Sequence, residues 1–191
     1  MKTLFTSLFL AILLLPDLAS GATPAGWFLA GNDPKSYRVE RDATVARDGK
    51  PSALLASTKV SSGFGTMMQS FEPDDYRGKR LRMSAWVKAQ EVTQWAGLWM
   101  RVDGENRAML AFDNMQTRPI TGTRNWSRHE VVLDVPPAAT SISMGILLVG
   151  EGSVWINDVR LDIVDKSVPV TGNGNAMGQN RKPTNLDFEK N

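Results

Sequence analysis

Tryptophan, arginine and acidic side chains share the polar side of two apolar segments in the middle of the chain. In Leu81–Lys88 the odd positions are apolar, whereas Trp86 lies among arginine, serine and lysine at the even positions. The alternation recurs in Leu98–Asp103, where Trp99 shares a side with Arg101. Indole rings are flat apolar platforms for the C–H faces of sugars, and charged groups beside them can hold hydroxyl groups by hydrogen bonds. The sequence therefore predicts a ligand-binding face made of Trp86, Trp99, Arg101, Asp103, Asp113, Asn114 and Gln116.

The same residue types can also serve packing. Arg101 and Asp113 could form a cross-strand ion pair covered by tryptophan, or the N-terminal segment could cover the indole rings. The residue pattern leaves the binding and packing interpretations open.

The sequence contains few features that favour catalysis or nucleic-acid binding. His129 is the one histidine, no serine sits in a nucleophile-elbow pattern, and the chain has no cysteine for thiol chemistry or disulfides. The acidic pair Asp74–Asp75 stands beside a proline and is typical of a turn. The formal charge is +2 with acids and bases interleaved, so no basic stripe points to nucleic acid. We predict a protein that is not an enzyme.

The elements that must position these residues are short strands. Turn-forming clusters rich in Gly, Pro, Asn and Asp separate apolar runs throughout, and no long window has a helical period. The predicted fold class is all-β, an antiparallel β-sandwich of jelly-roll type. The segment Gly152–Val164 alternates with period two and reads as a strand with one buried face. In it, one side is predicted to hold Trp155, Asn157, Val159, Leu161 and Ile163.

The chain divides into four predicted parts. Residues 1–22 have a basic start, an apolar run and then small residues, which is typical of a secretory signal peptide. The folded domain is expected over 23–166, a flexible polar linker over 167–184 and a candidate returning strand over 185–191. We expect an exported protein, periplasmic or secreted, without a membrane span once the signal is removed.

Three stretches together resemble a known family. Gly26–Gly31 (GWFLAG), Trp95–Asp103 with Phe112–Gln116, and Gly152–Val159 (GSVWINDV) are similar to bacterial exported carbohydrate-binding-like, or galactose-binding-like, jelly-roll modules. Such modules are appended to erythromycin-esterase-like hydrolases and to regulators. The resemblance implies a carbohydrate or a similar polar ligand. No cofactor is required, but the resemblance also implies a structural Ca²⁺, with Asp158 carried over from the closing strand and Glu40 and Asp42 as further candidate ligands.

One departure from this family concerns the C-terminal segment. Modules of this kind often begin with a strand similar to Asn-Leu-Asp-Phe-Glu, and here that segment stands at residues 185–189. It could supply the missing strand by folding back or by pairing with a neighbouring molecule. The alternatives are a disordered tail or the start of a second module. The leading function is a non-catalytic, exported binding module. One alternative is a protein-interaction or assembly module that uses an open sheet edge and the segment 185–189, and the other is a stand-alone relative of a hydrolase accessory domain.

Overall fold

The computed structural model describes residues 21–172 of the 191-residue chain. Almost every element within that range is an antiparallel strand, as the sequence predicts. The strands are β1 (Phe28–Gly31), β2 (Tyr37–Arg47), β3 (Lys50–Ser57), β4 (Phe64–Phe71), β5 (Arg80–Asp103), β6 (Met109–Asp113), β7 (Ile120–Asp134), β8 (Ser141–Val149) and β9 (Ser153–Val164). Two short 3₁₀ turns, η1 (Pro34–Ser36) and η2 (Glu105–Arg107), interrupt them. None of the described helices is long and apolar enough to cross a membrane.

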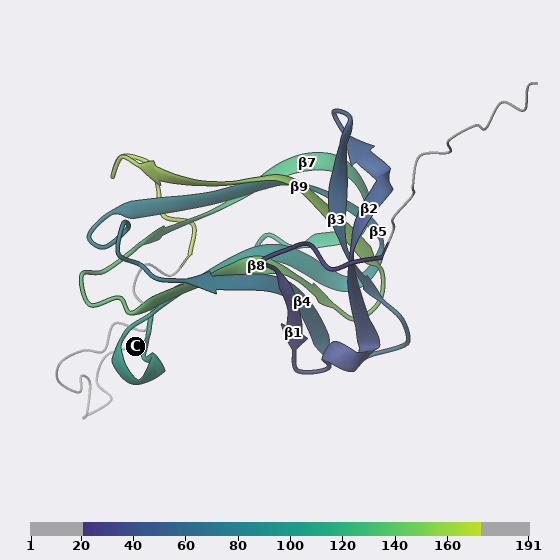
Figure 1. The fold of residues 1–191 in the computed structure, drawn as a ribbon, viewed down its shortest axis with the longest axis horizontal. Helices are drawn as coiled ribbons and strands as arrows, with labels where there is room; N and C mark the ends of the chain where they lie inside the picture. The colour runs from purple at the N-terminus through teal and green to yellow at the C-terminus, as the bar shows by residue number, and fades with distance from the viewer. Residues whose placement is uncertain (1–20, 173–191) are drawn as a thin grey trace, which may run out of the picture.

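The long strand β5 belongs to both layers of the sandwich (Figure 1). Its first half pairs with β7 and β9, and β3 and β2 continue that layer, which we call the first layer. Its second half pairs with β6 and β8, and β4 and β1 complete the second layer. Register shifts between the halves, with Glu91 at a φ of 54°, mark the place where the strand passes between layers.

The core lies between the two layers. Alternate residues of β5 point inward along both halves, and leucine, isoleucine and methionine from β4 and β8 meet them. The largest fully buried side chains include Leu55, Met67, Leu81, Met83, Leu98, Met100, Ile142, Ile146 and Leu148. A second, smaller cluster on the outer side of the first layer contains Leu54, Ala56 and Trp155.

A β-bulge in β9 corrects the predicted facing of that strand. Ser84 and Trp86 of β5 pair with Arg160 and Asn157, so β9 has one extra residue there, and Asp158 takes a φ of 51°. Before the bulge Val154 and Ile156 face the core; after it Val159 and Leu161 do. The prediction that Trp155 shares a side with Val159 was wrong, because a bulge shifts the alternation by one residue.

The start of the predicted linker is docked on the sandwich. The Arg80 guanidinium donates to the backbone carbonyls of Lys166 and Val168, and the backbone N–H of Thr171 donates to the Val132 carbonyl at 3.0 Å. The interpretation of residues 167–172 as a flexible linker was therefore wrong. Residues 173–184, the candidate strand 185–191 and nearly all of the predicted signal peptide lie outside the described residues.

Candidate functional site

A groove of about 680 Å³ lies on the outer face of the second layer. The strands β1, β4, β5, β6 and β8 supply its lining, because side chains that alternate outward on neighbouring strands gather on one surface. Its aromatic residues are Phe64, Trp95, Trp99 and Phe112. Its polar residues are Thr66, Ser70, Arg101, Asp103, Arg107, Asn114, Ser141 and Ser143. The groove thus combines apolar surfaces with several hydrogen-bonding groups.

Trp99 forms part of the floor of the groove and does not project from it. Its indole N–H donates to Thr66 Oγ1 at 2.7 Å, and that hydroxyl donates to the Ile146 carbonyl at 2.9 Å. The side chain is 9% exposed. Its cross-strand neighbour is Gly145, where an added Cβ would lie 2.2 Å from the Met67 carbonyl oxygen. The strands are therefore tightly packed beneath a fixed indole ring.

Arg101 and Asp103 form an ion pair in the groove. The guanidinium Nη2 lies 2.7 Å from Asp103 Oδ1, and Nε donates to the same oxygen at 2.8 Å. Nη2 also donates to the Arg107 carbonyl at 3.3 Å, within a turn where Asn106 and Arg107 have φ values of 53° and 58°. The Asp103 side chain is 13% exposed and that of Arg101 38%, so the carboxylate orients a guanidinium that solvent or a ligand can reach.

Trp86 does not belong to this groove. The first half of β5 presents Trp86 on the outer face of the first layer, the opposite side of the sandwich from Trp99. The Arg47 guanidinium lies 3.8 Å from the ring centroid, a cation–π contact from the β2–β3 hairpin. The prediction of one face holding Trp86 and Trp99 was wrong because β5 changes layer between them.

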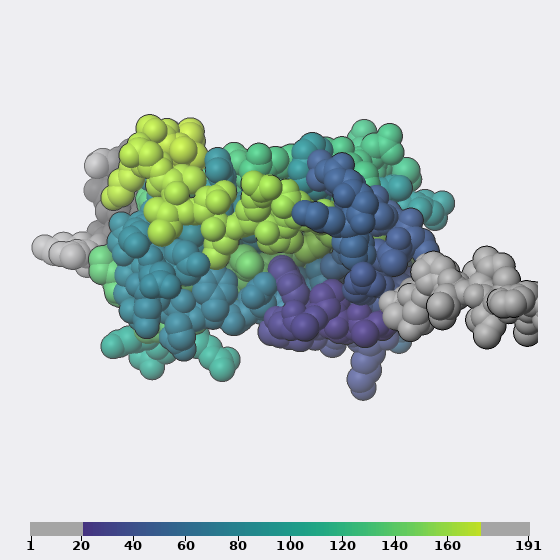
Figure 2. Space-filling model, turned by 45° about the horizontal axis from the view of Figure 1, so that its top comes forward, coloured from purple at the N-terminus to yellow at the C-terminus, as the bar shows by residue number. Residues whose placement is uncertain are grey.

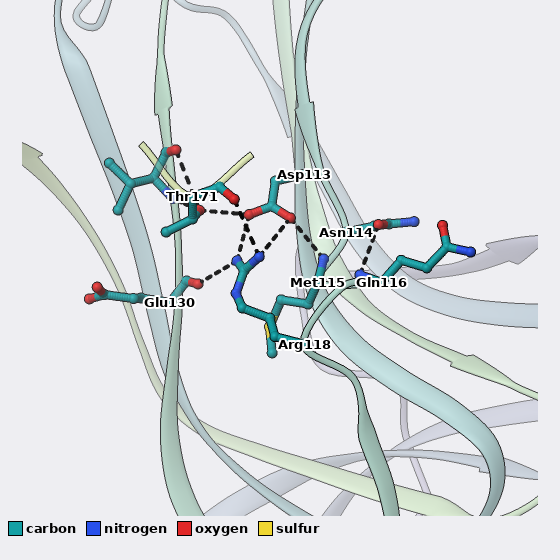
Figure 3. A network of polar contacts seen from close by, with 8 residues as sticks. Asp113, Asn114, Met115, Gln116, Arg118, Glu130 and Thr171 are labelled. Carbon is teal, nitrogen blue, oxygen red and sulfur yellow. Dashed lines mark hydrogen bonds and ion pairs between the residues drawn. The ribbon is translucent and has the colours of Figure 1, made fainter. Parts of the chain in front are cut away.

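Asp113 faces the interior, and its partner is Arg118 (Figure 3). Its carboxylate accepts from Arg118, from the Thr171 hydroxyl at 2.6 Å and from the Met115 backbone N–H at 2.9 Å. Burial by itself raises the pKa of Asp113, but the hydrogen bonds from Arg118 and Thr171 outweigh it and hold the pKa below its usual value. The sequence had also allowed an ion pair between Arg101 and Asp113. That alternative was wrong, because Arg101 pairs with Asp103.

The register of β6 explains this difference. Asp113 pairs with Met100, which faces the core, and Phe112 pairs with Arg101, which faces the groove. Asn114 lines the groove, and its side-chain oxygen accepts from the backbone N–H of Gln116 at 3.1 Å. Gln116 itself is exposed and does not line the groove. Of the seven predicted residues, the groove brings together Trp99, Arg101, Asp103 and Asn114.

Sequence reasoning missed Trp95, Phe64, Phe112 and Arg107 as groove residues. One signal was available for Trp95, which stands four residues before Trp99 and so shares its side of a strand. For Phe112, alternation with Leu110 predicts an inward side chain, and this prediction was wrong, because Phe112 pairs with Arg101 and lines the groove.

Each of the three predicted calcium ligands has a partner of its own. Glu40 pairs with Arg38, and Asp158 pairs with Arg160 at 3.1 Å. Asp42 Oδ2 accepts from the Trp155 indole N–H at 2.8 Å. Within residues 21–172, no three acidic, histidine or cysteine side chains are placed to hold a metal ion. These residues do not form the proposed ligand set, and a structural Ca²⁺ stays an untested prediction.

His129 lies half-buried on β7. Its Nε2 is 2.9 Å from Ser127 Oγ, two residues away on the same strand. Burial, and then the nearby positive charge of Arg118, lower the pKa of the imidazole. Non-enzymatic function remains a prediction from the sequence.

Comparison with known proteins bears on the fold. No protein-family model matches the chain. The xylan-binding CBM22-1 domain of Paenibacillus barcinonensis Xyn10C superimposes with a TM-score of 0.55 at 16% identity, over 78% of this chain and 94% of that domain. TmCBM61, solved with β-1,4-galactotriose, gives 0.50 at 14% identity over 74% of this chain and 91% of that module. The chain has the β-sandwich fold of these carbohydrate-binding modules.

One relative found by sequence is a transcriptional regulator. The uncharacterized HTH-type transcriptional regulator YbfP of Bacillus subtilis is 44% identical in an alignment of 167 residues that covers 86% of this chain. The chain spans 57% of that regulator's length. The resemblance to a carbohydrate-binding-like module is supported by the fold, whereas an association with erythromycin-esterase-like hydrolases stays a prediction.

Proposed function

We propose that the groove on the second layer binds a carbohydrate, with a sugar ring lying against Trp95 and Trp99. The observation that carries this proposal is the placement of two indole rings beside the Arg101–Asp103 ion pair in one open groove. Tryptophan provides apolar contact for sugar C–H groups, and the guanidinium donates to hydroxyl oxygens. The xylan-binding and galactotriose-bound neighbours share the fold and support this choice of ligand class.

Binding can be measured by isothermal titration calorimetry against xylo-oligosaccharides and β-1,4-galacto-oligosaccharides. We expect Trp95→Ala to weaken binding at least tenfold, about 1.4 kcal/mol, because the half-buried ring contributes contact area without holding the core. Trp86→Ala is the matched control and should leave affinity unchanged, since Trp86 lies on the other layer.

Equal losses in Trp95→Ala and Trp86→Ala would contradict the groove as the site. Absence of binding to any member of a broad glycan panel by the unaltered protein would remove the carbohydrate proposal itself.

Export is part of the same proposal and is supported by residues 1–22 alone. N-terminal sequencing of protein recovered from the periplasm or culture medium should begin at Ala22 or Thr23, because the small residues before them favour cleavage there. A cytoplasmic protein that begins at Met1 would contradict export.

A further inference from the structure

Both layers leave part of a strand edge open on the same side of the sandwich. β9 pairs with β3 only over Ser153–Ile156, and beyond that point the Asn157 side chain donates to the carbonyls of Lys50 and Pro51. Among the described residues, Asp158–Val164 of β9 pairs only with β5. β4 likewise pairs with β1 only as far as Met68. Backbone N–H and C=O groups on an open edge can accept another strand.

A cleft of about 480 Å³ lies between these two open edges and is separate from the groove. Gln69 and Met144 line it from the second layer, and Val159 and Leu161 line it from the first. Trp27 also lines the cleft, and Figure 2 shows the N-terminal residues, in purple, lying against the yellow-green C-terminal residues. The cleft therefore exposes apolar side chains that belong to the core face of both layers.

Ile163 shows that this apolar surface extends along the open edge. It pairs with Leu81, whose side chain is fully buried in the core, so Ile163 also points to the core side. Its side chain is nevertheless 51% exposed. An exposed core-facing isoleucine on an unpaired edge is the surface that an added strand would cover.

The rim of the cleft carries an excess of positive charge. Arg41, Lys50 and Arg160 line it together with one carboxylate, Asp158. Asp158 is already paired with Arg160. Within residues 21–172, neither Arg41 nor Lys50 has a carboxylate at ion-pair distance. The cleft is thus complementary to a segment with apolar side chains and acidic neighbours.

Residues 185–189, which lie outside the described residues, have that pattern. Leu186 and Phe188 alternate with Asp187 and Glu189. In an extended strand the two apolar side chains would point one way and the two acids the other.

The chain is long enough to bring this segment to the cleft. Thr171 is bound to Val132, and Val132, Arg82 and Asp162 lie side by side across β7, β5 and β9. At about 4.8 Å per strand, the open edge of β9 lies roughly 15–20 Å from Thr171. Residues 173–184 provide twelve residues, which can extend about 40 Å.

We propose that Asn185–Glu189 binds its own domain as an added strand along Asp158–Val164 of β9. Leu186 and Phe188 enter the cleft, and Asp187 and Glu189 point to the outer side of the first layer, near Lys50 and Arg160. The C-terminal segment then covers the open side of the sandwich.

Hydrogen exchange of the full chain, followed by mass spectrometry on peptides covering 158–164, tests this proposal. The double variant Leu186→Ser/Phe188→Ser should exchange at least tenfold faster at the β9 amides, because the added strand is lost. Met177→Ser removes an apolar residue from the preceding segment and should leave exchange unchanged. Unaltered near-ultraviolet circular dichroism in both variants would show that the sandwich is folded.

A second variant tests the charge pairing independently. Asp187→Lys/Glu189→Lys should also accelerate exchange at 158–164, and more strongly at low than at high salt, because screening weakens the new repulsion. Equal exchange in the unaltered chain and the Leu186→Ser/Phe188→Ser variant would overturn the proposal. Protection that is lost on dilution together with a dimer seen by light scattering would also overturn it, and would assign the cleft to a second copy.

Discussion

Asp113→Ala is expected to destabilise the protein by about 3 kcal/mol in urea unfolding at neutral pH. The substitution removes the acceptor for Arg118, for the Thr171 hydroxyl and for the Met115 N–H. Removing one partner of a buried pair typically costs about 3–5 kcal/mol, and the 34% exposure of the Arg118 side chain places this case at the lower end. The docked residues 165–172 should also become more susceptible to proteolysis, because Thr171 loses its link to β6.

Asp162→Ala is the matched control for this prediction. It also breaks an Arg–Asp pair, to Arg82 at 3.3 Å, but its side chain is 42% exposed. An exposed pair contributes under about 1 kcal/mol. Comparable losses in Asp113→Ala and Asp162→Ala would show that the Asp113 network does not stabilise the fold as its contacts indicate.

Asp42→Asn is expected to cost about 2 kcal/mol at pH 7. The Asp42 carboxylate accepts from the Thr44 N–H and hydroxyl through Oδ1 and from the Trp155 indole through Oδ2. Burial opposes its ionisation, but these hydrogen bonds and that from the Val45 N–H prevail and lower the pKa to about 2. An amide would place an N–H₂ donor against one of these donors, so one buried donor loses its acceptor.

The stability difference between the unaltered protein and Asp42→Asn should depend on pH, because the pKa of Asp42 is lowered in the folded state. The unfolded carboxyl titrates near 3.8 and the folded one near 2, so the stabilisation is fully present above about pH 4 and is lost as the pH falls through 2. The stability gap between the unaltered protein and Asp42→Asn should therefore narrow between pH 4 and pH 2.

Asp48→Asn is the control for this prediction. Asp48 stands at an exposed hairpin position with φ 50°, and its substitution should change stability by less than about 0.5 kcal/mol. A gap that stays constant down to pH 2 would contradict the assignment.

Alternation along single strands carried most of what the sequence predicted correctly. In β5 it placed Leu98 and Met100 in the core and Trp99 and Arg101 on the outer face, and the structure shows both. The all-β class followed from frequent turn signals and the lack of a helical period. These features are local, because an alternation of apolar and polar residues can be recognised within one strand without knowing its partners.

The errors arose where pairing between distant strands decides the outcome. Trp86 and Trp99 have opposite parity in β5, and only the passage of that strand between layers settles which surface each joins. The side of Asp113 depends on its register with Met100. The bulge at Asp158 depends on the pairing of β9 with β5. None of these relations is visible in a single strand.

The order of strands along the chain bears on how the protein can assemble. β5 pairs with β6, β7, β8 and β9, all of which follow it, and Leu81 meets Ile163 near the end of β9. During synthesis the second layer therefore cannot close until β8 has left the ribosome, and the first layer cannot close until β9 has followed. Contacts so distant in sequence form slowly, since a large loop must close before they are made. The protein should thus acquire its structure in one late step, and its first half should stay open to chaperones until then.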